Sequence, residues 1–313
     1  MFISIIIPCR NEEKFIGKCL ESIVRQYYPK ENLEVLVVDG NSKDKTKEII
    51  KEFSFQYPFI KLLENPKKFT PFGLNIGIKA SRGGIIIRMD AHAEYEKDYI
   101  SKCVKYLQES GADNVGGIIK TMPSKNTLTA RAIAKVLSHP FGAGNSYFRI
   151  GLKEPRSADT VFGGCYKKEV FSPPPAGVGL FNEKMIRAQD IEFNKRLIKS
   201  GGKILLYPDI VAYYYPPAGF WKFFKHNFID GFWVTYPLKF KVRFFSLRHL
   251  VPLFFVLTLP LSIWPYILVS LFFSLKIALK EDLRYFFILP FVFFNRHFAY
   301  GFGSLWGLIR III

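Results

Sequence analysis

The first 110 residues alternate between short apolar runs and segments with helical periodicity. Phe2–Ile7 and Leu33–Val38 are predominantly apolar, which is typical of strands buried on both faces of a sheet. Between these runs, apolar side chains recur at helical spacing: Ile16, Leu20, Ile23, Val24 and Tyr27. Helices are expected next over 43–53, 71–80 and 96–109, with strands over 60–63 and 84–89. This alternation predicts an α/β fold with a mainly parallel sheet and helices on both faces.

Polar side chains follow three of the expected strands, at the point where each strand ends. Residues 8–12 (PCRNE) follow the first, Asp39 and Gly40 the second, and Asp90 and His92 the fourth. Because ligands of such sheets bind beyond the carboxyl ends of the strands, these residues are expected to converge on one site. A glycine-rich dinucleotide fingerprint and a GxxxxGK[ST] sequence are both missing, which argues against Rossmann oxidoreductases and P-loop enzymes.

Asp90 and His92 flank a single residue in the sequence D-A-H. A carboxylate and an imidazole two residues apart at a strand end can both face a divalent cation that bridges a diphosphate. The pattern alone is a weak signal, because Asp90 could equally cap a helix and His92 could be an ordinary surface or core histidine.

Asp190 stands at the start of an amphipathic helix that is expected to end at Gly201 and Gly202. At a helix start the backbone dipole favours a negative charge, and a carboxylate there can act as a general base toward a hydroxyl. Without the surrounding sequence, a simple capping role for Asp190 would be the better interpretation.

Taken together, these segments resemble the family 2 glycosyltransferases, which have the GT-A fold. The resemblance begins with SIIIPCRNEEKFIGKCLESI and VLVVDGNSKDKT and continues with LNIGIKASRGGIIIRMDAHAEY, whose D-A-H stands where the family has its metal-binding D-x-D. It goes on with VFGGCYKKEVF, similar to the acceptor loop, and GLFNEKMIRAQDIEFNKRL, similar to the helix that carries the catalytic base. The chain is most similar to the membrane-anchored succinoglycan-biosynthesis glucosyltransferase type. The resemblance covers roughly residues 1–215 and is looser over the tail.

The resemblance implies a role for individual residues. On the donor side it places residues beside the nucleobase, the ribose and the diphosphate: Pro8, Arg10, Glu12, Asp39 and Asp90. His92 would take the place of the second Asp of D-x-D, so that Asp90 and His92 hold Mn²⁺ or Mg²⁺. Asp190 would be the catalytic base. Gly163, Gly164 and Trp233 would contact the acceptor.

The chain departs from the family pattern at a few positions. Gln189 replaces the Glu of the usual Glu-Asp pair, so a single carboxylate is left there, and Asn182 replaces the Asp usual before Glu183. The Q-x-x-R-W motif of processive synthases has no good match, since HNFIDGFW keeps Trp233 without the Arg. A processive polymer synthase is therefore disfavoured.

The C-terminal part, residues 249–313, is expected to be a membrane region. Leu250–Leu275 contains no charge over 26 residues, more than the roughly 20 that a helix needs to cross a bilayer. Its prolines are expected to bend or split it into a hairpin. Tyr285–Ile309 is a second candidate, but Arg296 at its middle carries a charge that is costly in lipid. We therefore expect this segment to be broken, to be re-entrant, or to turn Arg296 and His297 toward protein or the interface. We expect at least two membrane elements.

The stretch 221–248 combines ten aromatic residues with six Lys/Arg and one acid. Rings interleaved with cations are typical of an interfacial segment, although an ordinary packed helix pair would give the same composition. The positive-inside rule then places this end, and the preceding domain, in the cytoplasm. Four scattered cysteines lack metal-ligand or redox spacing and are expected to be reduced and structural. The expected division is 1–220 GT-A domain, 221–248 interface segment and 249–313 transmembrane region.

From these features the sequence predicts an inverting, metal-dependent glycosyltransferase in polysaccharide or glycolipid biosynthesis. The expected donor is a nucleotide-sugar, first of all a UDP-sugar, and the expected acceptor a polyprenyl-linked or other lipid-linked saccharide. The alternatives are transfer to a soluble or protein acceptor, a catalytically silent nucleotide-sugar-binding membrane protein, and a nucleotidyltransferase. The net charge of +18 could also suit nucleic acid, but its densest excess lies beside the first apolar span, so nucleic acid is not expected as a partner.

Overall fold

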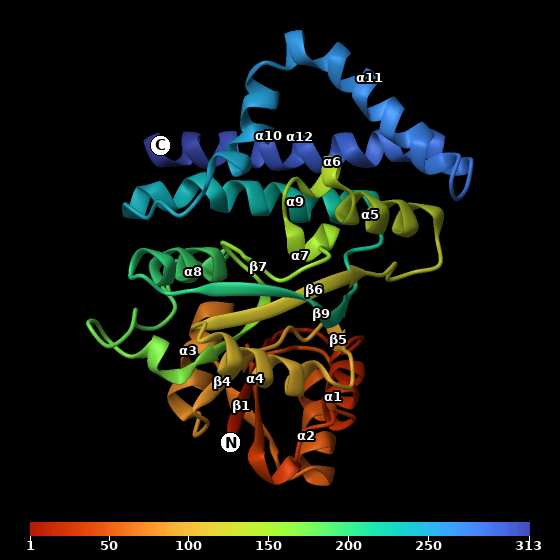
Figure 1. Cartoon of the computed structure of the whole chain (residues 1–313). Helices are drawn as coiled ribbons and strands as arrows, with labels where there is room; N and C mark the ends of the chain where they lie inside the picture. Colours follow the sequence, from red (N-terminus) through yellow and green to blue (C-terminus); the bar gives the residue numbers. More distant parts are fainter. The chain divides into compact units, whose positions relative to one another are not determined.

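A computed structural model describes all residues, 1–313, as two compact units. The sheet unit comprises Met1–Ile119 and Gly151–Tyr214, and the helical unit comprises Lys120–Ile150 and Tyr215–Ile313. Figure 1 shows strands in the first unit and long helices, coloured blue toward the C-terminus, in the second.

The first half of the sheet is parallel, as the sequence predicts. Its strand order is β3-β2-β1-β4, formed by β1 (Ile3–Cys9), β2 (Leu33–Asp39), β3 (Ile60–Glu64) and β4 (Ile85–Arg88). The connections are α1 (Ile16–Val24), the short η1 (Lys30–Asn32), α2 (Thr46–Gln56) and α3 (Thr70–Ala80). The strands β1, β2 and β4 are buried almost throughout, which explains why they lack an alternating polar face. The expected helical residue Tyr27 is an exception, because α1 ends before it and its side chain is exposed.

The second half of the sheet corrects the expectation of a mainly parallel sheet. The order continues β8-β6-β9-β5, with β8 (Phe162–Lys167) antiparallel to both β4 and β6 (Asn114–Thr121). The strand β9 (Ile204–Tyr214) pairs antiparallel with β5 (Ala93–Tyr95) and β7 (Arg156–Ser157). The sheet is therefore mixed. Hydrophobic periodicity does not encode strand direction, and β8 enters the sheet only after the excursion of the chain into the helical unit.

Three helical elements complete the sheet unit: α4 (Tyr99–Ser110), η2 (Lys168–Phe171) and α8 (Gln189–Lys199). α4 packs against β8 and β9, and it ends at Gly111, whose φ of +65° is the left-handed conformation that favours glycine. α8 ends just before Gly201, as expected from the sequence. All four cysteines are free and buried, in agreement with a structural role.

The helical unit is built around its last helix, α12 (Arg284–Ile312), which packs most extensively against four other helices. These are α5 (Leu128–Ser138), α9 (Phe220–Thr235), α10 (Leu247–Leu257) and α11 (Leu259–Ala278). Shorter pieces are α6 (Pro140–Ala143), α7 (Tyr147–Ile150) and η3 (Tyr236–Phe240). The core of the unit joins α5 to α12 through apolar side chains such as Ile133, Val136, Leu289 and Phe293.

Small residues bring α9 and α12 close together, and Figure 1 shows the two helices side by side. A Cβ added to Gly303 would collide with the carbonyl of Phe228, and one added to Gly231 with the carbonyl of Tyr300. Across the same contact, Thr235 Oγ1 donates to the carbonyl of Ser304 at 2.6 Å. Glycines and hydroxyl hydrogen bonds of this kind are how helices associate where the hydrophobic effect is weak.

The apolar tail is split, as its prolines predict. The run Leu250–Leu275 divides at Thr258 into α10 and α11, directly before Pro260. By length and composition alone, one helix, α11, could cross a membrane, and α10 is a shorter apolar helix. α12 is a single continuous helix that turns Arg296 and His297 toward other parts of the protein. That agrees with one of the alternatives expected for these residues, whereas a second spanning helix stays a prediction.

Candidate active site

The loops after β1, β2 and β3 meet at Gly40. Its N–H donates to the carbonyl of Cys9 at 2.8 Å, and an added Cβ would lie 2.7 Å from the carbonyl oxygen of Lys68 and 3.3 Å from Cβ of Arg10. Only glycine fits at this point, so the sequence Asp39-Gly40 fixes how closely these loops approach. The expected convergence of polar residues on one edge of the sheet is therefore present for this group.

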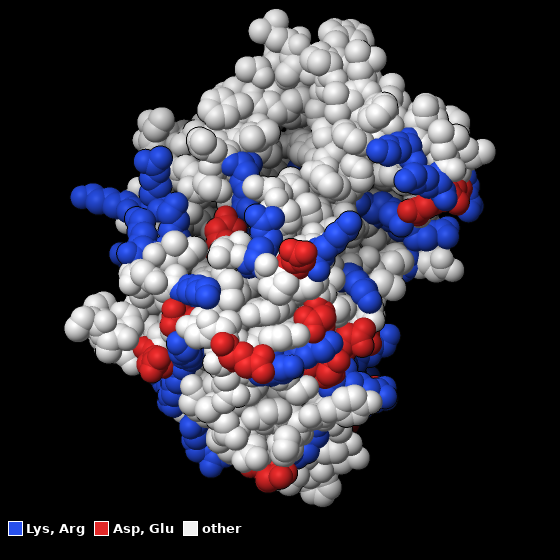
Figure 2. All heavy atoms as spheres, in the orientation of Figure 1, with Lys and Arg blue, Asp and Glu red and all other residues white.

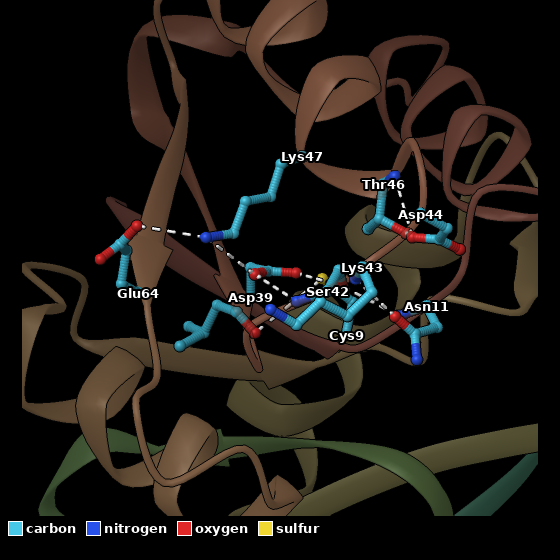
Figure 3. Close-up of polar contacts among 10 residues, drawn as sticks. Cys9, Asn11, Asp39, Ser42, Lys43, Asp44, Thr46, Lys47 and Glu64 are labelled. Carbon is cyan, nitrogen blue, oxygen red and sulfur yellow. Dashed lines mark hydrogen bonds and ion pairs between the residues drawn. The ribbon is translucent and has the colours of Figure 1, made fainter.

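Asp39 is buried at the end of β2 and holds the turn that follows it (Figure 3). Its carboxylate accepts hydrogen bonds from the backbone N–H of Ser42 at 3.0 Å and from the Ser42 hydroxyl. Lys47 Nζ lies 3.6 Å from Asp39 and 3.3 Å from Glu64 (Figure 3). In this structure Asp39 organises the loop, and its predicted contact with a base or ribose stays a prediction.

The loop after β1 is fixed by Asn11, which has a left-handed φ of 56°. The Asn11 N–H donates to Ser42 Oγ at 2.8 Å, and its side-chain oxygen accepts from the Lys43 N–H at 2.8 Å (Figure 3). Pro8 is half-buried and Arg10 is exposed beside this turn. Side-chain-to-backbone hydrogen bonds thus join the loop after β1 to the loop after β2. They fix the backbone around Pro8 and Arg10 without involving the side chains of these two residues.

The side chains of Glu12 and His92 are in contact, which the sequence does not predict. His92 Nδ1 lies 3.4 Å from Glu12 Oε1, and its ring packs 5.5 Å from the ring of Tyr214. Burial by itself disfavours the imidazolium, but the carboxylates of Glu12 and Asp90 outweigh it and raise the pKa of His92. The loop after β1 therefore reaches the D-A-H segment through a direct contact.

Arg88, the last residue of β4, connects the donor side of the site with the expected base. Its Nη2 lies 2.9 Å from Asp90 Oδ1 and its Nη1 lies 3.2 Å from Asp190 Oδ2. The side chain of Arg88 is only 9% exposed, compared with 17% for Asp90 and 28% for Asp190. Burial would lower the pKa of Arg88, but the two carboxylates raise it instead, so the guanidinium stays charged.

Asp190 lies in the first turn of α8, as predicted. The helix begins after Ala188, which has a left-handed φ of 57°, and the Ile191 N–H lies 2.9 Å from Asp190 Oδ1. Gln189 is buried, and the next acid along, Glu192, is held by Arg196 at 2.8 Å. The departure from the Glu-Asp pair thus leaves Asp190 as the single carboxylate of this turn that faces Arg88.

The residues expected to contact the acceptor lie in both units. Gly163 and Gly164 in β8 have φ of +70° and +106°, and an added Cβ at Gly163 would lie 2.6 Å from the carbonyl oxygen of Arg88. Gly163 therefore lets β8 approach the end of β4 closely, and Gly164 leaves room for the ring of Tyr166. Trp233 lies in α9 of the helical unit, with its ring 5.7 Å from that of Tyr236.

We compared the sequence and the structure with those of known proteins. A family model described as "Glycosyl transferase family 2" matches residues 4–166, just over half of the 313 residues. The chain belongs to glycosyl transferase family 2. The family match ends within β8, so it covers the Asp39, Asp90 and His92 positions but not Asp190.

Individual relatives extend the similarity over both units of this family 2 member. It is 35% identical, over 99% of its length and 98% of the relative, to the Methanococcus voltae "Dolichyl N-acetyl-alpha-D-glucosaminyl phosphate 3-beta-D-2,3-diacetamido-2,3-dideoxy-beta-D-glucuronosyltransferase". It is 29% identical to succinoglycan biosynthesis protein ExoA of Rhizobium meliloti, over 71% of this chain and 67% of that one. The predicted resemblance to the family, including the succinoglycan type, is confirmed.

A solved structure shares the fold. The mannosyltransferase PcManGT from Pyrobaculum calidifontis, in complex with GDP-Man and Mn²⁺, aligns with a TM-score of 0.66 and 18% identity. The alignment covers 97% of this chain and 87% of that one. The mixed sheet of this glycosyltransferase is thus of the GT-A type.

The side chains of D-A-H suit a divalent cation as ligands, although they form no complete cage. No group of three or more His, Cys, Asp or Glu is arranged to hold a metal ion. Asp90 Oδ2 and His92 Nε2 make no hydrogen bond, so one carboxylate oxygen and, in the neutral imidazole whose Nδ1–H faces Glu12, one ring nitrogen could act as metal ligands. Asp90 and His92 would supply ligands of a kind that suits Mn²⁺ or Mg²⁺, with the remaining ligands left to the substrate or water.

Arg88 contacts two of the candidate site residues, and it was not among the residues that the sequence singled out. The signal for it was present, because Arg88 is a charge within the apolar strand sequence GIIIRM, two residues before Asp90. A charge in a buried strand requires a partner, and here it has two. Arg88 and Asp190 are 102 residues apart in the sequence, so no local sequence pattern reveals their contact.

Proposed function

We propose that this glycosyltransferase is an inverting, metal-dependent enzyme that moves a sugar from a nucleotide-sugar to a lipid-linked saccharide. The observation that carries the chemistry is the Arg88 bridge between Asp90, on the donor side, and Asp190, the base. The acceptor class is supported by the M. voltae relative, whose name gives a dolichyl-phosphate-linked N-acetylglucosamine as acceptor. The similarity to that relative extends through the helical unit as well as the sheet unit.

In the proposed reaction Asp190 takes the proton of the acceptor hydroxyl. The hydroxyl oxygen attacks the anomeric carbon from the face opposite the nucleotide, and the bond from that carbon to the diphosphate oxygen breaks with its electron pair. The sugar is transferred with inversion and a nucleoside diphosphate leaves. A single carboxylate is enough for this displacement, which fits the replacement of the paired Glu by Gln189.

Arg88 acts as a positioning residue in this scheme. Because the same guanidinium contacts Asp90 and Asp190, the orientation of the base is coupled to the carboxylate that faces the donor. A divalent cation held by Asp90 and His92 would neutralise charge that develops on the diphosphate leaving group. Pro8, Arg10, Glu12 and Asp39 are proposed to line the nucleoside part of the donor, and Gly163, Gly164 and Trp233 the acceptor.

The surface of the helical unit supports a membrane location. α11 exposes a stripe of large apolar side chains, and so does α10: Leu261, Trp264, Leu268 and Phe272, then Leu247, Val251, Phe254 and Leu257. On the face seen in Figure 2, the surface over α10 and most of α11 lacks Lys, Arg, Asp and Glu. A continuous apolar surface of this kind marks contact with lipid or protein.

Basic residues lie in the segment before α10. Lys239, Lys241 and Arg243 are exposed there, where they can meet lipid phosphates. We therefore propose that 221–248 lies at the cytoplasmic interface, that α11 and its neighbours form the membrane region, and that the sheet unit is cytoplasmic.

The donor prediction is tested by a screen of UDP-, GDP- and TDP-sugars with Mn²⁺ or Mg²⁺, read out as released nucleoside diphosphate. We expect one donor class to be used, with UDP-sugars first, and the GDP-Man of the fold relative makes GDP-sugars the main competitor. Release of pyrophosphate instead would indicate a nucleotidyltransferase. No turnover with any donor and acceptor would favour a silent nucleotide-sugar-binding protein.

A further inference from the structure

Arg296 places a positive charge at the middle of α12, in the apolar part of the chain. Its Nε lies 3.4 Å from the carbonyl oxygen of Gly142, its Nη1 donates to Oδ1 of Asn227, and its guanidinium stacks 5.3 Å from the ring of Tyr300. All of these partners are neutral, and no carboxylate lies within ion-pair distance of it. A charge in an apolar region is costly unless an opposite charge meets it.

His297, the next residue, is a polar side chain whose contacts are all structural, and it serves as a comparison for Arg296. Its Nε2 lies 2.8 Å from the carbonyl oxygen of Phe141, and its Nδ1 lies 2.8 Å from the hydroxyl of Tyr266. A neutral imidazole satisfies both contacts, with Nε2–H donating and Nδ1 accepting. His297 therefore links α12 to α6 and α11, and both of its ring nitrogens are hydrogen-bonded. Arg296, in contrast, has no carboxylate partner for its charge.

Asn227 supplies a second unsatisfied group at the same place. It is fully buried in α9, and its Oδ1 is taken by Arg296. Its Nδ2 is buried and makes no hydrogen bond. Arg296 therefore lacks an anionic partner and Asn227 Nδ2 lacks an acceptor, and the two side chains are hydrogen-bonded to each other. An anion with several oxygens would satisfy both groups.

Other charged groups lie around the pair. Arg248 donates to Asn145 Oδ1 at 3.2 Å, and Arg248, Arg296 and Asp230 all lie close enough to Tyr300 to act on its hydroxyl electrostatically. Asp230 also lies 3.3 Å from His226 Nε2. Among the charged groups that act on Tyr300, two are arginines and one is an acid, and the exposed faces of the neighbouring α10 and α11 are largely apolar.

We propose that Arg296 and Asn227, with Arg248 nearby, bind the phosphate group of the lipid-linked acceptor. This rests on the proposed function and names the part of the chain that recognises the lipid carrier. A phosphate joined to an isoprenoid chain matches both properties of the site, since its oxygens accept from guanidinium and amide donors while its chain lies on apolar helices. A bilayer phospholipid offers the same chemistry, so the experiment distinguishes the two sources.

The test compares two acceptors that carry the same sugar and the same polyprenyl chain, one joined through a phosphate and one through a neutral glycosidic bond. The informative variant is Asn227→Asp, which keeps the size of the side chain and its bond to Arg296 but adds a negative charge and removes the Nδ2 donor. Arg296→Gln removes the charge instead. Arg310→Gln, an exposed arginine of the same helix, is the matched control.

We expect Asn227→Asp and Arg296→Gln to raise KM for the phosphate-linked acceptor at least tenfold while leaving KM for the neutral one within twofold. Asn227→Asp should not lower the unfolding temperature, and Arg310→Gln should change neither KM. Polyprenyl phosphate in detergent should raise the unfolding temperature of the wild-type enzyme but not of the variants, whereas polyprenol and phosphatidylglycerol at the same concentration should raise neither.

Two results would overturn the proposal. One is an equal loss on both acceptors in Asn227→Asp, which would make the pair a structural tie. The other is equal stabilisation by phosphatidylglycerol and polyprenyl phosphate, which would assign the site to a bilayer lipid. If the wild-type enzyme used only soluble saccharides but was still stabilised by polyprenyl phosphate, the proposed acceptor would be wrong while the phosphate site remained.

Discussion

Arg88 of the sheet unit and Arg296 of the helical unit both place a guanidinium in apolar surroundings, but they are compensated differently. Arg88 lies between two carboxylates, Asp90 and Asp190, at 2.9 and 3.2 Å. Arg296 contacts an amide, a backbone carbonyl and an aromatic ring. A compensated charge fixes the geometry of its partners, whereas an uncompensated one is suited to a ligand that brings the opposite charge. In the proposed function, the sheet unit therefore supplies the chemistry and the helical unit binds the lipid-linked substrate.

The largest effect is expected at the base. Asp190→Asn keeps the shape of the side chain and a contact to Arg88 but removes the proton acceptor, so turnover should fall by about 10³-fold or more. Donor affinity, measured by calorimetry with a non-transferable analogue, should change little. Retained turnover would remove Asp190 from the catalytic role.

A comparable loss should follow from removing the metal or its imidazole ligand. Chelation or His92→Ala should reduce transfer by about 10²-fold or more, because charge on the leaving diphosphate is no longer neutralised. His92→Asp restores the D-x-D form and should keep metal-dependent transfer. If His92→Asp were as inactive as His92→Ala in Mn²⁺ and Mg²⁺ titrations, His92 would have another role.

Removing the compensated charge should affect both activity and stability. Arg88→Gln leaves Asp90 and Asp190 without their shared partner, so kcat should fall about 10²-fold and the free energy of unfolding by up to about 3 kcal/mol. Since Arg88 acts through Asp190, the double variant with Asp190→Asn should be little slower than Asp190→Asn alone. The exposed Arg25 offers a control, and Arg25→Gln should change neither quantity.

A smaller effect tests the close contact of the helices in the other unit. Gly303→Ala would push a methyl group into the carbonyl of Phe228 and should lower the free energy of unfolding by about 1–3 kcal/mol. At Gly219 an added Cβ would meet nothing within 4 Å, so Gly219→Ala serves as the control. Equal unfolding temperatures for the two variants would contradict the close packing of α9 on α12.

An effect of similar size at neutral pH, which shrinks in acid, concerns a contact away from the site. Burial alone would raise the pKa of Glu34, but hydrogen bonds from Ser4 at 2.6 Å and from Arg82 lower it below its usual 4.5. The stabilisation by this carboxylate is therefore complete above about pH 4.5 and is lost as the pH falls through its folded value. Glu34→Gln should cost about 1–3 kcal/mol at pH 7, and the difference from wild type should shrink at pH 3. A difference that grows on acidification would contradict this assignment.

The sequence predicted the first half of the sheet and the family, but not the whole arrangement of the site. Apolar runs identified β1, β2 and β4 because strands buried on both faces lack polar positions. The antiparallel β8 and its approach to β4 depend on contacts far apart in sequence, and so does the Arg88–Asp190 pair. For the same reason, the prolines of the tail predicted a bend or a split but not its position at Thr258, and the pattern left open which alternative Arg296 adopts.

We propose that the sheet unit carries the chemistry and the helical unit binds the lipid-linked substrate. The most direct test of this proposal is the acceptor preference of the detergent-purified wild-type enzyme. Release of nucleoside diphosphate would be measured with one saccharide presented either on polyprenyl phosphate or free in solution. We predict a kcat/KM at least about 100-fold higher for the lipid-linked form. Efficient transfer to the soluble saccharide, with the lipid-linked form ignored, would contradict it.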